Sequence, residues 1–71
     1  MEIVKLREND EFIKLGQALK KAGLESSGVD AKMDIVNGNV KVNGEVETRR
    51  GRKLYDGDVL EFNNIQVKIE R

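Results

Sequence analysis

The chain has 71 residues, and its 13 Lys and Arg balance 13 Asp and Glu, so the formal net charge is zero. A domain this small hides only about 60% of the surface of its unfolded chain, which leaves no room for a cleft between two lobes. Cys and His are absent, which excludes disulfides, thiolate chemistry, imidazole acid–base catalysis and the usual zinc ligands.

The sequence contains no candidate membrane segment. No apolar run approaches the roughly 20 residues that span a bilayer, and Met1 is followed by Glu2 rather than by a basic and then apolar leader. We therefore expect residues 1–71 to form one cytoplasmic domain that is monomeric, lies away from membranes, and needs no cofactor or metal. Only carboxylates, lysines and one tyrosine remain as catalysts, so we expect no enzyme.

The zero net charge conceals a segregation of charge along the chain. Residues 1–11 carry two basic and four acidic side chains, residues 54–71 carry the same numbers, and residues 12–53 carry nine basic and five acidic ones. Four of these cations crowd into residues 49–53. Such crowding favours an anionic partner, whereas the alternative is an ordinary solvated cluster of surface charge.

The first half of the chain predicts a strand and two helices. Residues 2–6 indicate an edge strand. Asn9 or Asp10 is expected to cap a first helix that ends at Gly23, and its apolar stripe consists of Phe12, Leu15, Leu19 and Ala22. Ser26 or Ser27 is expected to cap a second helix that ends at Asn37-Gly38.

The second half predicts four strands. Val40 and Val42 are joined to Val46 through Asn43-Gly44, the strongest short hairpin signal, because both central residues of a type I′ turn need a positive φ. Asp56-Gly57 predicts a turn before a strand at 59–62, and Asn63-Asn64 separates this strand from one at 65–69. The elements predict an α+β fold, with two short helices packed against a small, mostly antiparallel sheet in the order β-α-α-β-β-β-β.

These elements carry an ordered set of residues within 12–62. The set consists of the Val-x-Val-Asn-Gly hairpin at 40–44 together with Lys14-Leu15, Leu19, Gly23-Leu24, Ser27, Ala31-Lys32, Ile35, Gly38 and Gly57-Asp58. By this set the chain resembles the S-four RNA-binding domain. The run from Arg49 to Leu54 followed by Gly57-Asp58 is closest to the small stand-alone bacterial members, the YbcJ/YaaA-like proteins.

The resemblance implies the S-four-like fold, or alpha-L motif, and a link to RNA and ribosome-related roles. Two positions depart from the family pattern. Gly28-Val29 stand where many members have arginines after the capping serine, so the phosphate contacts shift to residues 49–53. Asp34 stands where an apolar residue is usual, and since a lone buried carboxylate is destabilising, we expect it to be exposed at the rim or paired with a lysine.

The candidate RNA-binding residues are cations that can grip phosphates, since the planar fork of arginine holds two oxygens and also stacks on bases. The main candidates are Lys14, Lys32, Arg49, Arg50, Arg52 and Lys53. Weaker candidates are Lys20, Lys21, Lys41 and Tyr55. Tyr55 either stacks on a base or folds back over the core, and we slightly favour the core. Asp58 is expected to fix its turn, and Phe12 and Phe62 are expected in the core.

Two functions follow from this pattern. The first is a non-catalytic protein that grips a structured RNA, such as ribosomal RNA or a ribosomal precursor, through phosphate contacts. The alternative is a protein-interaction subunit that docks on a ribosome or partner protein through its strand edge or acidic ends, with incidental RNA contact. Salt dependence separates the two, because phosphate binding releases counterions.

Overall fold

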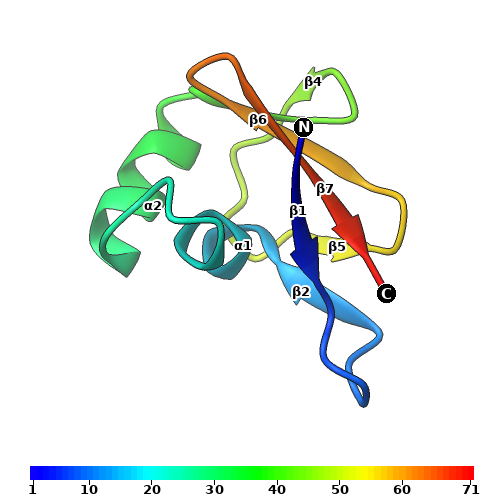
Figure 1. Cartoon of the computed structure of the whole chain (residues 1–71). Helices are drawn as coiled ribbons and strands as arrows, with labels where there is room; N and C mark the ends of the chain where they lie inside the picture. Colours follow the sequence, from blue (N-terminus) through cyan, green and yellow to red (C-terminus); the bar gives the residue numbers. More distant parts are fainter.

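The computed structural model describes all 71 residues as two helices and two sheets (Figure 1). The larger sheet has five strands in the order β1-β7-β6-β3-β4, and the smaller one pairs β2 with β5. The helices lie together on one side of the larger sheet (Figure 1). The elements are β1 (Glu2–Lys5), β2 (Phe12–Lys14), α1 (Leu15–Lys21), α2 (Gly28–Val36), β3 (Val40–Val42), β4 (Glu45–Val46), β5 (Lys53–Tyr55), β6 (Val59–Phe62) and β7 (Ile65–Glu70).

The predicted α+β class, with two packed helices against a mostly antiparallel sheet, is confirmed. The five predicted strands are present in the predicted order around the helices, and β1 is an edge strand as expected. β1 is the exception to the antiparallel pairing, because it runs parallel to β7, with Val4 opposite Ile69. The structure adds two short strands, β2 and β5, that the sequence pattern did not indicate.

The predicted turns have the backbone that their residues require. Asn43 and Gly44 both have positive φ, at 52° and 86°, and they connect β3 to β4. Asn63 and Asn64 also have positive φ and connect β6 to β7. Asp58 fixes its turn as expected, because its carboxylate accepts from the backbone N–H of Tyr55 at 2.8 Å.

Helix α2 follows its prediction, whereas the start of α1 does not. Ser27 caps α2 and accepts a hydrogen bond from the N–H of Asp30 at 3.2 Å. Helix α1 begins only at Leu15, so neither Asn9 nor Asp10 is its cap. Its first N–H groups are instead satisfied by a distant loop: Leu15 donates to the carbonyl of Arg52 and Gly16 to that of Arg50. A side-chain cap is therefore unnecessary.

Residue Phe12 is placed differently from the prediction. It begins strand β2, opposite Tyr55 of β5, rather than the first helix. Its ring is half-buried and lies outside the hydrophobic core. Phe62, by contrast, is buried in the core as expected.

The core lies between the helix pair and the inner face of the larger sheet. Leu15, Leu19 and Ile35 are fully buried against strand residues such as Val40 and Leu60. Each such side chain contributes roughly 1.5–3 kcal/mol when removed from water. Burial of the helix residues holds the start of α1 against the sheets. Neither helix is long and apolar enough to cross a membrane.

The carboxylate of Asp34 is partly exposed, in line with the first of the two expectations, and it forms no ion pair with a lysine. It is half-buried and accepts a hydrogen bond from the side-chain amide of Asn39 at 3.1 Å. Glu25 lies beside it, and the hydrogen bond to Asp34, with burial and the negative charges of Asp34 and Asp30, raises the pKa of Glu25 to about 7. Asp34 therefore lies between an amide and a second carboxyl group.

Candidate nucleic-acid interface

The basic loop, residues 47–53, is fastened to the start of α1 by backbone hydrogen bonds. The carbonyl of Arg52 accepts from Leu15 N–H at 2.9 Å, and the carbonyl of Arg50 accepts from Gly16 N–H at 3.1 Å. At the other end of the loop, Glu47 N–H donates to the carbonyl of Val40 at 2.9 Å. The cations of this loop are therefore presented at a fixed place beside α1.

The buried carboxylate of Glu47 organises the loop from within. Its Oε2 accepts from Nε of Arg49 at 3.0 Å and from the backbone N–H of Arg49 at 3.1 Å, while its Oε1 accepts from Nη1 of Arg52 at 2.8 Å. These bonds, from Arg49 first and then Arg52, lower the pKa of Glu47 to about 2 despite its burial. The carboxylate is therefore ionised and satisfied by two arginines.

Glu47 divides the predicted basic cluster into two kinds of cation. Arg49 and Arg52 are partly neutralised, because both form ion pairs with Glu47. Arg50 forms no ion pair, and Lys53 lies over the ring of Phe12, 4.8 Å from its centroid, as a cation–π contact. The sequence analysis treated these four residues as one group. Glu47 lies close to both arginines in the sequence, and this was the available signal for the ion pairs. Its burial, however, depends on the tertiary structure.

A small basic cradle lies where the loop meets the two helices. It has a volume of about 280 Å³. Three of its lining residues are glycines. Its three cations, Lys14, Lys20 and Arg50, form no ion pair. Residues Gly16, Gln17, Gly28 and Gly51 complete the lining. The structure thus brings together Lys14 and Arg50, which were main candidates, with Lys20, which was a weaker one. Gly16 and Gly28 were missed.

The two-stranded sheet displays aromatic and basic side chains on one face. Phe12 is opposite Tyr55 and Lys14 is opposite Lys53, and because side chains alternate along a strand, these four share a face. The rings of Phe12 and Tyr55 have centroids 5.9 Å apart. Tyr55 is 47% exposed, so the slightly favoured placement over the core is wrong. Two lysines directly opposite each other repel, which an anionic ligand would relieve.

The remaining candidates lie outside the cradle. Lys32 is exposed on α2, one turn beyond the cradle residue Gly28. Lys21 on α1 donates a hydrogen bond from Nζ to the carbonyl of Lys5 at 2.7 Å and so ties α1 to β1. Lys41 lies on the outer face of the larger sheet, opposite Glu61 of β6. These positions give Lys32 a place near the cradle and separate Lys41 from it.

Comparisons with known proteins agree with this architecture. Residues 4–70 match the S4 domain, and the chain belongs to that family. It is similar to a solved structure of YbcJ from Escherichia coli, described as revealing an alpha-L motif involved in RNA-binding, with a TM-score of 0.73, 34% sequence identity, and coverage of 100% of this chain and 89% of the other. The predicted family resemblance is thereby confirmed.

Two relatives are similar along most of their length. The Bacillus subtilis (strain 168) protein named "Probable ribosome maturation protein RlbA" is 50% identical over 60 residues, which covers 80% of this chain and 84% of that protein. YbcJ of Escherichia coli (strain K12) is 39% identical over 57 residues, which covers 80% of this chain and 81% of that protein.

Proposed function

We propose that this chain is a non-catalytic RNA-binding protein that grips a structured RNA by its phosphates. The observation that carries the proposal is the basic cradle, where Lys14, Lys20 and Arg50 converge outside every ion pair of the protein. Cations left unpaired in a concave, glycine-lined site suit phosphate oxygens, because glycine lets the ligand approach the backbone closely.

The face of the two-stranded sheet extends this site. Lys53 adds a fourth cation, and the half-buried ring of Phe12 and the exposed ring of Tyr55 offer surfaces on which an unpaired base can stack. Arg49 and Arg52 contribute less to phosphate binding than the sequence alone suggests, since Glu47 offsets part of their charge. Their guanidinium groups instead stabilise the loop through the ion pairs with Glu47.

The names of the relatives support ribosomal RNA or a ribosomal precursor as the target. One relative is named for ribosome maturation, and the solved neighbour is described by an RNA-binding motif. We propose that the chain acts as a monomer in the cytoplasm and binds such an RNA.

Salt titration tests the phosphate-gripping mechanism. If Lys14, Lys20, Arg50 and Lys53 each engage one phosphate, the slope of log K against log salt should be about −3. The measurement is fluorescence anisotropy with a labelled ribosomal RNA hairpin at several salt concentrations. Undiminished binding with a slope near zero would refute the mechanism.

Protein docking is a second candidate function, and one feature of α2 favours it. Val29, Met33 and Val36 are 72%, 58% and 55% exposed, and their spacing of four and three residues places them in one stripe on the helix. Such a stripe suits an apolar partner surface. Substitution of Met33 by Gln, which is polar but uncharged, should abolish docking of this kind while leaving the salt slope for RNA unchanged.

A further inference from the structure

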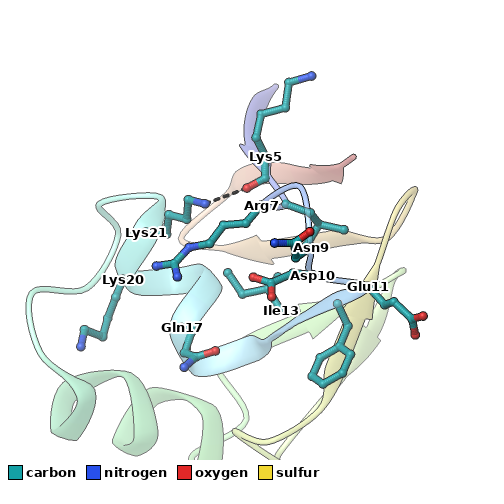
Figure 2. Close-up of a pocket in the computed structure, with 11 residues that line it drawn as sticks. Lys5, Arg7, Asn9, Asp10, Glu11, Ile13, Gln17, Lys20 and Lys21 are labelled. Atoms are coloured by element: carbon teal, nitrogen blue, oxygen red, sulfur yellow. Dashed lines mark hydrogen bonds between the residues drawn. The ribbon is translucent and has the colours of Figure 1, made fainter.

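The largest concavity of the protein is a groove beside α1 that adjoins the basic cradle. Its volume is about 850 Å³, enough for a nucleotide. The segment between β1 and β2 forms one wall and α1 the other (Figure 2). The lining residues are Lys5, Leu6, Arg7, Asn9, Asp10, Glu11, Phe12, Ile13, Gln17, Lys20 and Lys21.

The charges in this groove are sorted by position. Figure 2 shows the guanidinium group of Arg7 extending toward Lys20 and Lys21 of α1, whereas Asn9 and Asp10 lie farther along the same segment. Arg7 and Asp10 are held in one turn by the hydrogen bond from Asp10 N–H to the Arg7 carbonyl, at 3.0 Å. Neither side chain takes part in an ion pair, so both are available to a ligand.

The groove is continuous with the basic cradle. Gln17 and Lys20 of α1 line both concavities. An RNA strand whose phosphates occupy the cradle therefore meets Lys20 and then Arg7 if it continues along α1.

Asp10 shows that the groove is not simply more phosphate-binding surface. A carboxylate repels phosphate, and it accepts hydrogen bonds without donating any. It fits an RNA site where it faces N–H groups, which bases carry on their Watson–Crick edges. Guanine presents two neighbouring donors there, N1–H and the N2 amino group, and so matches the two oxygens of a carboxylate.

We propose that this groove binds an unpaired guanine nucleotide flanking the structured RNA held in the cradle. Arg7 and Lys20 hold its phosphate, the half-buried side chain of Ile13 contacts the base, and Asp10 accepts from its N1–H and N2 groups. This proposal rests on the proposed RNA-binding function and extends it to a base-reading subsite.

The test compares short RNA hairpins that differ only in an unpaired extension at either end of the stem. The extension carries guanosine, uridine or an abasic nucleotide, and a blunt hairpin is the reference. With the parent protein, guanosine at one end should strengthen binding about tenfold over the blunt hairpin. The abasic extension should gain less than twofold, and uridine should fall between the two.

Variants with matched controls assign the effect to the groove. Arg7→Ala and Asp10→Ala should each remove most of the gain from guanosine. Glu8→Ala removes the same charge from the same turn without lining the groove, and Lys68→Ala removes a cation from β7, so both should keep the gain. Circular dichroism verifies that each variant is folded.

The outcomes separate the two proposals. Equal gains from abasic and guanosine extensions, or a full gain in Asp10→Ala, would overturn the guanine subsite while cradle-dependent binding of the blunt hairpin persists. Absence of any cradle-dependent binding to the blunt hairpin would overturn the proposed function and this inference together.

Discussion

Arg52 and Glu47 form the shortest ion pair of the protein, with Nη1 of Arg52 2.8 Å from Oε1 of Glu47. The carboxylate is buried, whereas the arginine side chain is 35% exposed. The pair joins the end of β4 to the start of β5 and fixes the loop that supplies Arg50 to the cradle. A buried acid within a basic loop thus sets the shape of the candidate interface.

Replacing Glu47 by Gln should therefore destabilise the protein by about 1–3 kcal/mol, because hydrogen bonds to a buried charge are lost or weakened. The variant should also release Arg49 and Arg52, so its binding to RNA should become more salt-dependent and less selective among RNA hairpins. Urea denaturation and anisotropy measure the two effects. Glu45→Gln, at an exposed position on β4, is the matched control and should leave both quantities unchanged.

The cradle cations should matter for RNA and not for folding. Changing Lys14 and Arg50 together to Ala should weaken binding of a ribosomal RNA hairpin at least tenfold, since two phosphate contacts are lost. The melting temperature should stay nearly constant, because exposed substitutions usually change stability by about 0.5 kcal/mol or less. Lys41→Ala, on the outer face of the sheet, serves as the control. Full affinity in the double variant would remove the cradle from the interface.

The turn at Asn43-Gly44 makes a prediction about stability. Gly44 has a φ of 86°, so Gly44→Ala should destabilise the protein by about 1–2 kcal/mol, the usual penalty for a side chain in the left-handed region. At Gly51 the φ is not positive and a new Cβ would meet open space, so Gly51→Ala should be neutral or slightly stabilising. Chemical denaturation of the two variants decides between these effects, and equal midpoints would contradict the assignment.

Protonation of Glu25 should make stability fall as the pH rises toward neutrality. The pKa of Glu25 is about 7 in the folded protein against an ordinary value of 4.5, so between these values the folded state holds a proton that the unfolded state has lost. Its contribution is complete below about pH 4.5 and is lost as the pH rises through about 7. Glu25→Gln should remove this slope, whereas exposed Glu8→Gln should retain it.

Glu47 acts in the opposite direction. Its pKa is lowered to about 2 from 4.5, so its contribution is present above about pH 4.5 and is lost as the pH falls toward about 2. The free energy of unfolding should be measured between pH 3 and pH 8 in the parent, Glu25→Gln and Glu47→Gln. These curves separate the loss of stability at acidic pH from the loss near neutral pH. A parent stability that rises between pH 5 and pH 7 with no difference in Glu25→Gln would contradict the Glu25 assignment.

Features that depend only on neighbouring residues could be predicted from the chain. The positive φ of Gly23 and Asn43-Gly44, and the bond from Asp30 N–H to Ser27, arise within a few residues, so their signals are visible in the chain. The ordered motif set likewise indicated the family. These local signals were therefore enough to predict the class of fold and most of the cations of the candidate interface.

The partners that residues far apart in the chain find in each other could not be predicted in this way. Helix α1 begins at Leu15 because carbonyls of Arg50 and Arg52, more than thirty residues away, accept its first N–H groups. The same docking makes Glu47 a buried partner of two arginines and leaves Arg50 to the cradle. No spacing along the chain encodes these choices, because burial and hydrogen-bond partners are set only when the loop packs against the helix.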